Sequence, residues 1–424
     1  MGEVNAGEGR KDVLMIGFHF PPSTLSSGHL RLLAFAKYLP SFGWNPVVLT
    51  ARGNIYERSD PASISTIPPD VCVHRAFALD ARRHMGIGGK YPSWLARPDR
   101  WVSWWPAAVL SGLHSIKRHR IRAIWSTYPI MTAHCVAHTL SRISGLPWIA
   151  DFRDPVASSV SGKDPATVAN QMRWEQRVMS RAACSVFTTP GAVRVGSSLH
   201  SSAPGEARIQ CIPNGFDEED FAGLEIGRPA RNGGPLHFVH SGVLYPEGRN
   251  PARFFEALSE LKRAGALKAS DIRVTLRASG SEDVYAEQLE QLGLTDIVTL
   301  APYLPYKDAL GEQAAADGLL LFQGERYDHQ IPAKVYEYLR LGRPILGLVG
   351  ENGDTAALLR EAGGAVTAPL NSASAIAAKF LEFIDSVKQS GNGMPSSPDV
   401  QRYSRRHATQ LLAGLLDRVC TNEK

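Results

Sequence analysis

The chain has 424 residues, a length that predicts two domains, and it is 44% hydrophobic and 21% charged, as is usual for soluble globular proteins. No run approaches the roughly 20 apolar residues of a membrane-spanning helix. Residues 1–10 are polar and glycine-rich without the apolar core of a signal peptide, which predicts a disordered lead. Five scattered cysteines without a Cys-x-x-Cys pair argue against disulfides and structural zinc, and they fit a reducing cytoplasm.

The formal net charge of +5 hides an uneven distribution. Residues 1–200 hold 23 Lys and Arg against 12 Asp and Glu, and residues 71–150 hold 11 basic and two acidic residues. Among these basic residues lie Trp94, Trp101, Trp104 and Trp105. Basic residues interleaved with tryptophan suit the surface of an anionic membrane, whereas nucleic acid is the weaker interpretation because no binding motif accompanies the charge. A solvated basic face over buried tryptophans explains the pattern equally well.

Short apolar runs alternate with helical segments along the first half of the chain, a pattern that predicts a parallel, doubly wound α/β sheet. Its first helix is expected at residues 30–39, where apolar positions have helical spacing. Residues 52–70 and 82–106 are expected to be long loops. The strands are expected at residues 13–17, 46–50, 71–76, 123–126, 148–150, 185–188 and 209–212.

The second half repeats this architecture after a polar, glycine-rich segment. Its strands are expected at residues 236–242, 273–278, 297–301, 318–322, 344–348 and 365–368. Its helices are expected at residues 251–264, 282–292, 306–315, 332–341, 354–362 and 372–388, and a last amphipathic helix at 402–420. The chain is therefore expected to contain two α/β units.

One segment of the second half, residues 329–344, carries the clearest chemistry. A proline suits the first turn of a helix and Gly342 suits its end, so the segment predicts a helix that follows a strand. Lys334 and Glu337 are three residues apart and share one face of that helix. A cation suits a diphosphate and a carboxylate suits ribose hydroxyls, which indicates a nucleotide-sugar site. An ordinary amphipathic helix with surface Lys and Glu is the alternative.

This segment resembles the donor-binding motif of GT-B glycosyltransferases, especially the retaining family four and its bacterial polysaccharide-assembly branch. That family usually carries two glutamates separated by seven residues. Glu337 matches the second glutamate, whereas His329 stands at the position of the first. Further family features follow in the expected order: Phe20-Pro21-Pro22, Gly28, Arg31, and Pro-Asn-Gly-Phe-Asp at 213–217.

The resemblance implies the α/β GT-B fold, which has two facing Rossmann-like domains and a C-terminal helix that crosses back to the first. The implied divisions are a lead at 1–10, an acceptor-binding domain at 11–217, a linker at 218–234, a nucleotide-sugar-binding domain at 235–395 and the returning helix at 396–424.

The donor candidates follow strands of the second half. The family places a glycine and then a cation after the first of these strands, where Gly242 and Arg249 stand. Among the other donor candidates, Ser279 and Gly280 could line the site of the nucleotide base, and Arg326 and Lys334 could bind the diphosphate. The remaining two are His329 and Glu337. Because the chain has no Asp-x-Asp, a metal-bound diphosphate is not expected. Neither a metal nor a cofactor is expected beyond the donor substrate, a nucleoside diphosphate sugar.

The acceptor candidates lie in the first half. Backbone donors of Ser26, Ser27 and Gly28 could approach a phosphate closely, with Arg31 as a nearby cation, unless the loop is a turn chosen for its geometry. After later strands, carboxylates could orient sugar hydroxyls or transfer protons, and an arginine could bind an acceptor phosphate or pair with an aspartate. The catalytic candidates are Asp151, Asp154 and His134, and the arginine is Arg153. His134 and His138 are spaced for zinc, but no third ligand accompanies them.

The resemblance implies transfer of a sugar, with retention of configuration, from a nucleotide sugar to a hydroxyl acceptor. The expected acceptor is lipid-linked or a growing glycan in bacterial surface polysaccharide biosynthesis. The expected location is the cytoplasm or the inner face of the plasma membrane. Two alternatives remain open: a GT-B sugar-nucleotide 2-epimerase, and a non-catalytic sugar-nucleotide-binding protein, which His329 would suit. The sequence identifies neither the sugar nor the acceptor.

Overall fold

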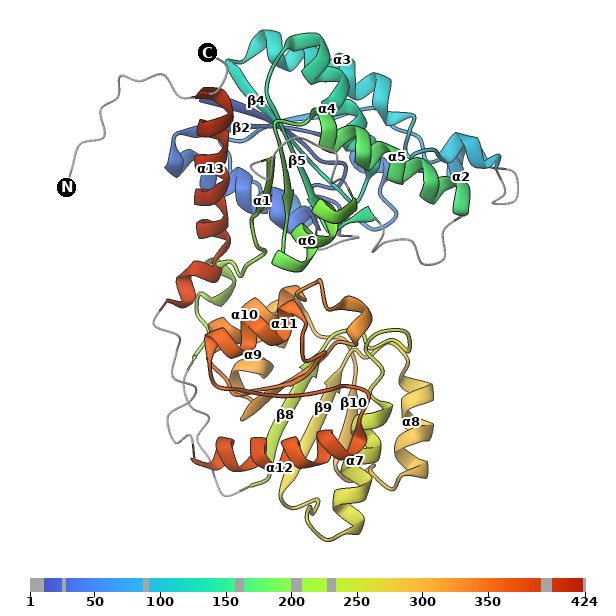
Figure 1. Cartoon of the computed structure of the whole chain (residues 1–424), viewed down its shortest axis with the longest axis vertical. Helices are drawn as coiled ribbons and strands as arrows, with labels where there is room; N and C mark the ends of the chain where they lie inside the picture. The colour runs from blue at the N-terminus through green and yellow to red at the C-terminus, as the bar shows by residue number, and fades with distance from the viewer. Residues whose placement is uncertain are drawn as a thin grey trace, which may run out of the picture. The chain divides into compact units, whose positions relative to one another are not determined.

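The computed structural model describes residues 11–24, 28–86, 91–156, 164–199, 208–226, 234–389 and 399–421. The chain divides into two compact units, both of the α/β class (Figure 1). The first comprises Met1–Asn214 and Arg405–Lys424, and the second comprises Gly215–Ser404. The end of the chain therefore belongs to the first unit.

The first unit is built on a seven-stranded sheet in the order β3-β2-β1-β4-β5-β6-β7, in which the paired strands are parallel. The strand order reverses between β1 and β4. The strands are β1 Lys11–Ile16, β2 Trp44–Ala51, β3 Cys72–Ala76, β4 Ile121–Thr127, β5 Trp148–Arg153, β6 Cys184–Phe187 and β7 Ile209–Cys211. The helices are α1 Gly28–Tyr38, α2 Ala81–His84, α3 Trp104–Arg118, α4 Met131–Ser144, α5 Pro165–Arg181, α6 Pro190–Leu199 and α13 Arg405–Thr421.

Both faces of this sheet are buried, because successive strand side chains point to opposite faces. In β1, Leu14 and Ile16 join a core that includes residues of α3 and α4. Val13 and Met15 join a second core that includes residues of α1 and α13. The apolar face of the last helix is thus covered by the first unit, which is why the chain returns to it.

The second unit is built on a six-stranded sheet in the order β10-β9-β8-β11-β12-β13, again with parallel pairs. Here the order reverses between β8 and β11. The strands are β8 Leu236–Ser241, β9 Ile272–Arg277, β10 Val298–Ala301, β11 Gly318–Phe322, β12 Ile345–Leu348 and β13 Ala365–Ala368. The helices are α7 Ala252–Arg263, α8 Glu282–Gln291, α9 Tyr306–Ala315, α10 Ala333–Leu341, α11 Asp354–Ala362 and α12 Ala373–Gln389.

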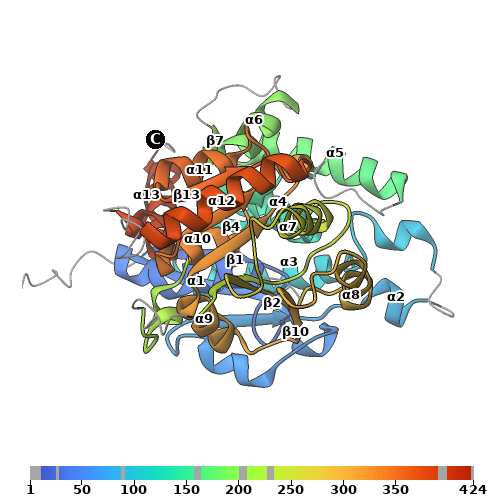
Figure 2. The same cartoon turned by 90° about the horizontal axis from the view of Figure 1, so that it is seen from below.

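Helices cover both faces of the second sheet as well. α7 and α12 lie side by side on one face (Figures 1 and 2), where their apolar residues pack against Phe238 and Leu320. Residues of α9, α10 and α11 pack against Val239 and Leu319 on the other face. Neighbouring strand residues again divide between two cores, as the unbroken apolar runs of the sequence predict.

The described elements follow the predicted ones closely in the second unit, where β11, β13, α9 and α11 have the expected bounds. The expected loop at 82–106 was partly wrong, because α3 begins inside it at Trp104, whose side chain is fully buried. Residues 218–221, expected in the linker, form a short 3-10 turn of the second unit with Phe221 in its core. The last helix begins at Arg405 rather than Arg402. No helix among the described residues combines the length and apolar character that crossing a bilayer requires.

Candidate functional site

Each sheet has one place where the strand order reverses, and open α/β sheets bind ligands at the carboxyl ends of the strands that flank such a place. In the second unit these strands are β8 and β11, and in the first unit they are β1 and β4. The two places are described separately below. Each of them gathers residues that the sequence predicted.

In the second unit, Lys334 lies in the first turn of α10 and reaches back to the end of β8. Its Nζ donates to the Ser241 carbonyl at 2.6 Å and lies 3.3 Å from His240 Nε2. His240 Nδ1 lies 2.8 Å from the Leu320 carbonyl and donates to it, which leaves Nε2 as the acceptor for Lys334. Burial, and then the Lys334 charge, hold the pKa of His240 well below its usual value, so this imidazole is neutral. An ammonium is therefore held by neutral groups at the point of reversal.

Gly242 makes room for this ammonium. Its φ of +118° lies in the region that side-chain-bearing residues rarely adopt. A Cβ at this position would also stand 2.9 Å from Lys334 Nζ. The backbone conformation therefore favours glycine here, and the absence of a side chain leaves space for Lys334 Nζ.

The pKa of Lys334 lies near neutral pH. Burial first and then the Arg249 charge lower its pKa to about 7, and the Glu337 charge opposes the shift. The Arg249 guanidinium lies over the Tyr245 ring at 5.1 Å from its centroid. The structure thus brings together Gly242, Lys334 and Arg249, with Glu337 one turn along the same helix. An anion bound here would favour the protonated lysine.

Glu337 is already engaged through one oxygen. Tyr306, the first residue of α9, donates its hydroxyl to Glu337 Oε1 at 2.8 Å, and the same hydroxyl lies 3.4 Å from Asp220 Oδ2. The sequence analysis missed Tyr306 and His240. A polar residue at the end of an otherwise apolar strand was the available signal for His240.

Ser279 and Gly280 follow β9 and lie beside the segment that follows β8. The Leu244 N–H donates to the Ser279 carbonyl at 2.8 Å, and a Cβ on Gly280 would stand 3.1 Å from Val243. The Ser279 hydroxyl is 3.3 Å from Glu282 Oε1, which also accepts from the Gly280 N–H at 2.8 Å. These residues line the same edge of the sheet as Gly242.

Arg326 and His329 lie elsewhere on the loop after β11. Arg326 is about half exposed and forms an ion pair with Glu247 at 3.7 Å. His329 follows Asp328, whose carboxyl is raised in pKa by burial and lies against two glycines of the next loop. A Cβ on Gly350 would stand only 2.2 Å from Asp328 Oδ1. Among the described residues, no hydrogen bond or ion pair joins Arg326 to Lys334.

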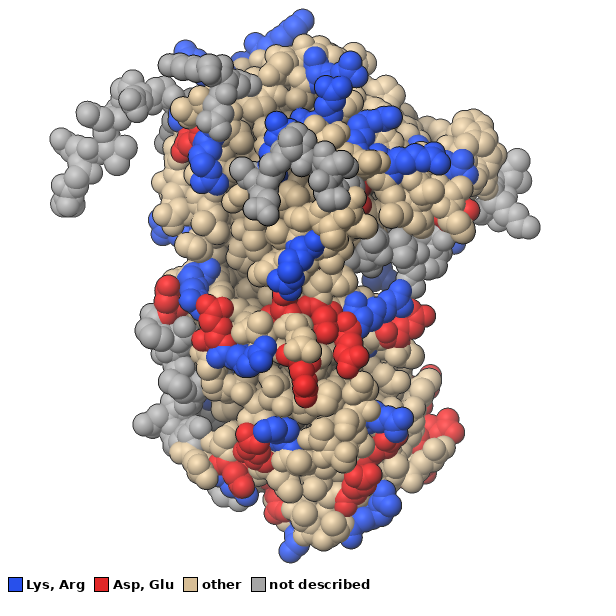
Figure 3. Space-filling view, viewed as in Figure 1, with Lys and Arg blue, Asp and Glu red and all other residues tan. Residues whose placement is uncertain are grey.

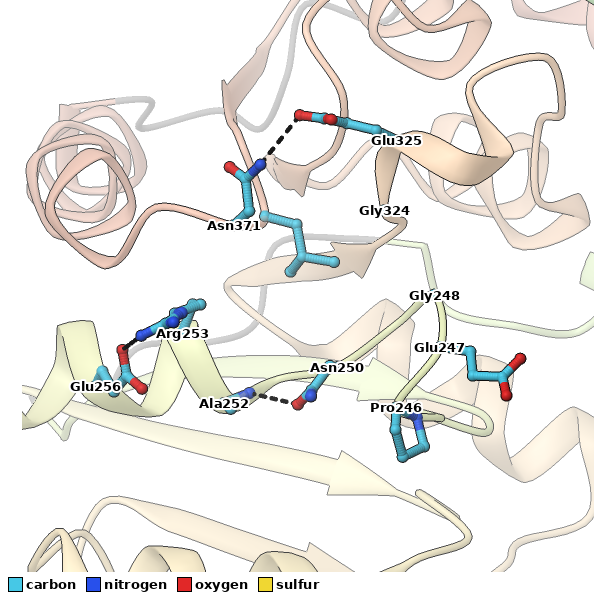
Figure 4. A pocket seen from close by; sticks show the side chains of 11 residues that line it. Pro246, Glu247, Gly248, Asn250, Ala252, Arg253, Glu256, Gly324, Glu325 and Asn371 are labelled. Carbon is cyan, nitrogen blue, oxygen red and sulfur yellow. Dashed lines mark hydrogen bonds and ion pairs between the residues drawn. The ribbon is translucent and has the colours of Figure 1, made fainter.

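A pocket of about 440 Å³ opens beside this loop in the second unit (Figure 4). The Gly324 N–H donates to the Gly248 carbonyl at 2.7 Å and closes one wall. Asn371 donates to Glu325 at 3.1 Å, and Arg253 pairs with Glu256 at 2.6 Å. With three carboxylates among its lining residues, the pocket suits neutral hydroxyl groups better than a diphosphate. The lining residues are Pro246, Glu247, Gly248, Asn250, Ala252, Arg253, Glu256, Gly324, Glu325, Leu370 and Asn371.

In the first unit, Arg31 and Asp151 form a buried ion pair. Arg31 Nε donates to Asp151 Oδ2 at 2.8 Å and Nη2 to Oδ1 at 3.3 Å, with the side chains 6% and 0% exposed. The same guanidinium donates to the carbonyls of Ile212 and Pro213, both at 2.9 Å. Arg31 was predicted as an acceptor cation and Asp151 as a catalytic group, but the structure uses both to hold α1, β5 and the segment after β7 together.

His134 occupies the core rather than a ligand site. Its side chain is fully buried, and its Nδ1 lies 2.7 Å from the Ser126 hydroxyl, which accepts from Trp148 Nε1 at 2.8 Å. Burial lowers the pKa of His134 to about 3. Its Nε2 has no hydrogen-bond partner among the described residues. This environment does not fit the predicted role of a catalytic acid or base, because the imidazole has no route to solvent.

Arg153 ends β5 in a strained conformation, with a φ of +64° at an irregularity in the pairing with β6. Burial lowers the pKa of its guanidinium, and the Asp151 and Asp154 charges oppose the shift. Its Nε has no hydrogen-bond partner among the described residues. Arg153 is thus a partly buried cation whose buried Nε has a donor to offer, flanked by the two aspartates that the sequence placed with it.

His19, which the sequence analysis missed, lies at the same edge. It follows β1, and its Nδ1 is 3.1 Å from the Ser23 hydroxyl. Burial, and then the charges of His29, Arg153 and Arg100, lower its pKa to about 4. Gly28 begins α1 nearby and is buried, whereas Ser26 and Ser27 lie outside the described residues. The edge beside β1 and β4 therefore concentrates basic groups around a neutral imidazole.

Several solved structures share this architecture over nearly the whole chain. The sucrose-phosphate synthase of Thermosynechococcus elongatus matches with a TM-score of 0.66 and 13% identity over 98% of this chain and 100% of that chain. Anabaena HepE in complex with UDP-glucose matches with a TM-score of 0.63 and 14% identity, covering 96% and 99% of the two chains. The lipopolysaccharide outer core galactosyltransferase WaaB matches with a TM-score of 0.62 and 12% identity, covering 96% and 99%.

These likenesses establish the fold. The chain has the GT-B fold of two Rossmann-like units with a C-terminal helix that returns to the first, which confirms the fold that the sequence resemblance implied. Neither a protein-family model nor a curated protein sequence matches the chain.

Proposed function

We propose that this protein is a glycosyltransferase that moves a sugar from a nucleoside diphosphate sugar to a hydroxyl acceptor. The observation that carries the proposal is the Lys334 ammonium, held by neutral groups at the point of strand reversal beside Gly242. A buried cation of this kind suits a diphosphate. The GT-B neighbour HepE, which has been solved with UDP-glucose, supports a nucleotide-sugar donor.

The residues of the second unit have distinct roles in this proposal. Lys334 and Arg249 would neutralise the charge that develops on the leaving diphosphate, which is a large contribution to catalysis of such transfers. Glu337 would accept hydrogen bonds from the ribose through the oxygen that Tyr306 leaves open. Ser279 and Gly280 would flank the base. The carboxylates of the pocket in Figure 4 would receive hydroxyl groups of the sugar.

The first unit would bind the acceptor. His19 is neutral at physiological pH because its pKa is about 4, so it has an acceptor lone pair for a hydroxyl proton. Arg153 carries the buried donor that would hold an acceptor phosphate or hydroxyl. Asp154 remains in the proposal as a partner of Arg153 rather than as an independent acid.

The acceptor we propose is a lipid-linked or growing glycan of bacterial surface polysaccharide, at the inner face of the plasma membrane. Figure 3 shows Lys and Arg over the first unit, with few acidic residues among them on the face in view. Trp94 is 66% exposed, whereas Trp104 is buried and Trp101 and Trp105 pack against the core. Membrane contact would therefore depend on Trp94 and on exposed basic residues of the same unit, such as Arg82 and Arg83.

A donor panel tests the proposal. Purified protein is titrated by calorimetry with nucleoside diphosphates, and the best binder is then offered as its sugar conjugates with lipid-linked and glycan acceptors. Release of the nucleoside diphosphate that depends on the acceptor supports transfer, and the anomeric configuration of the product by NMR decides retention. Interconversion of the donor without acceptor would identify a 2-epimerase. Tight binding without turnover would identify a binding protein, and no binding to any member of the panel would refute a nucleotide-sugar function.

A further inference from the structure

Three side chains with metal-binding chemistry converge at the edge strand of the first sheet, away from the sites described above. Cys72 is the first residue of β3, and His74 follows two residues later on the same face of the strand. His119 ends α3, which packs against β3. The Cys72 sulfur lies 3.4 Å from His74 Nε2 and 3.9 Å from His119 Nε2. We propose that these residues form a binding site for a transition metal ion, zinc above all.

The distances fit a single tetrahedral ion. With bonds of about 2.3 Å to sulfur and about 2.0–2.1 Å to nitrogen, tetrahedral zinc places its sulfur and nitrogen ligands about 3.6 Å apart. The two sulfur–nitrogen distances lie on either side of that value, and the three ligand atoms lie within 4.8 Å of one another. The two imidazole rings meet edge to face, with centroids 5.8 Å apart and planes at 73°. Each ring can therefore direct one nitrogen toward the same point.

The ligand set selects the kind of ion. One thiolate and two imidazoles suit zinc, cobalt or copper, whereas magnesium and calcium require oxygen ligands. A water molecule or His114, which lies on α3 close enough for its charge to act on His74, would supply the fourth ligand. Arg118 acts on both Cys72 and His74 and opposes a second cation. The negative charge of a metal-bound thiolate would offset that repulsion.

The position of the cluster indicates what the ion would do. Cys72 stands at the amino end of its strand, whereas the candidate ligand sites lie at the carboxyl ends of the strands. An ion here would join β3, at the edge of the sheet, to the end of a helix 47 residues further along the chain. We therefore assign it a structural role: it would stabilise the first unit and leave nucleotide binding by the second unit unchanged.

The test is a zinc titration of the purified full-length protein after removal of metals. Zinc is added in competition with a chromogenic chelator, and cobalt is added in parallel to detect a thiolate-to-metal charge-transfer band. One equivalent of zinc should bind, raise the melting temperature, and give the band with cobalt. Cys72→Ser should weaken zinc binding by roughly tenfold or more, because changes outside the ligand shell alone cost about 10–100-fold. Cys211→Ser, at an exposed cysteine of the same unit, is the matched control and should bind like the parent.

His119→Asn provides a second variant that leaves the edge strand unaltered. It should lose zinc affinity like Cys72→Ser, while near-ultraviolet circular dichroism and nucleoside diphosphate binding stay as in the parent. Equal zinc affinity in the parent, Cys72→Ser and His119→Asn would overturn the proposal, and so would a cobalt complex without a thiolate band. Those results would identify the cluster as a thiol hydrogen-bonded to two imidazoles.

Discussion

The six strands of the second sheet follow the same order as the first six strands of the first, yet the two units hold a principal cation differently. In the second unit the Lys334 ammonium donates to a backbone carbonyl and a neutral imidazole. In the first unit the Arg31 guanidinium is matched by the Asp151 carboxylate and two carbonyls. A cation that is paired at rest stabilises the fold, whereas a cation held by neutral groups is available to an anion. The comparison separates a residue that builds the scaffold from one that, in our proposal, binds a ligand.

The largest effect should come from breaking the scaffold pair. Asp151→Asn leaves the Arg31 charge buried without its counter-ion, which should cost about 3–5 kcal/mol of unfolding free energy in the first unit. Urea unfolding followed by tryptophan fluorescence measures this loss. Nucleoside diphosphate binding by the second unit, measured where the protein remains folded, should be unchanged.

A control for the loss of one acidic charge is Glu382→Gln in the second unit, where Glu382 forms an exposed pair with Lys379, because it should leave the fluorescence transition of the first unit unchanged. Exposed pairs contribute about 0–1 kcal/mol, so this variant should unfold close to the parent. If Asp151→Asn were as stable as Glu382→Gln, Asp151 would not be a scaffold residue, and its predicted catalytic role would regain support.

The second largest effect should come from the ligand-binding cation. Lys334→Ala removes charge-assisted hydrogen bonds to a diphosphate, which are worth about 1.5–3 kcal/mol, or roughly ten- to hundredfold in affinity. Calorimetry should show this loss for the nucleoside diphosphate and a much smaller one for the nucleoside. Arg326→Ala is the control, because Arg326 is half exposed and pairs with Glu247. Equal losses for the two variants would contradict a special role for Lys334, and a larger loss for Arg326→Ala would place the diphosphate nearer to Arg326.

Periodicity and turn residues were enough to predict both sheets and helix α10. Residues 318–322 and 306–315 form the predicted strand and helix because an apolar run and a helical pattern respond mainly to local sequence. Gly342 was predicted to end this helix because glycine readily adopts the left-handed conformation, and it does end α10 in that conformation. Lys334 and Glu337 then share a helix face by spacing alone. Local sequence patterns were therefore sufficient to predict a site that is built from one helix and the strand before it.

Pairings between distant residues could not be predicted in this way. The partners of Arg31 are 120 and more residues away, so nothing near Arg31 showed that its charge would be neutralised. The spacing around His134 did not reveal which face of α4 enters the core. Cys72 and His119 meet only because α3 packs against the edge strand, which is why the absence of Cys-x-x-Cys suggested no metal. Tertiary packing determines which distant residues meet, and that packing cannot be read from a single sequence.

A smaller effect is expected at the ribose. Glu337→Gln keeps the shape of the side chain but removes its charge, which should cost about 1.5 kcal/mol, or roughly tenfold in affinity. The loss should lie at the low end because the Tyr306 hydroxyl still has an amide oxygen to donate to. Removing the 2′-hydroxyl from the ligand should weaken binding to the parent more than to Glu337→Gln. An equal loss for both proteins would show that Glu337 does not contact that hydroxyl.

The smallest effect is a change of affinity with pH, and its sign follows from the neutral partners of Lys334. The pKa of Lys334 is lowered to about 7, and the protonated form is the one that binds a diphosphate. Affinity should therefore be highest below pH 7 and fall as the pH rises through 7, by about tenfold at most between pH 6 and pH 8.

Because the phosphate itself gains charge over this range and acts in the opposite direction, the slope must be compared with that of Lys334→Met, which has no titrating group. Calorimetry in buffers of different ionisation enthalpy should show proton uptake on binding at pH 7.5 by the parent, beyond that of Lys334→Met. The same pH slope and the same proton uptake in both proteins would mean that Lys334 is already charged before the ligand arrives, and the contrast with Arg31 would then rest on geometry alone.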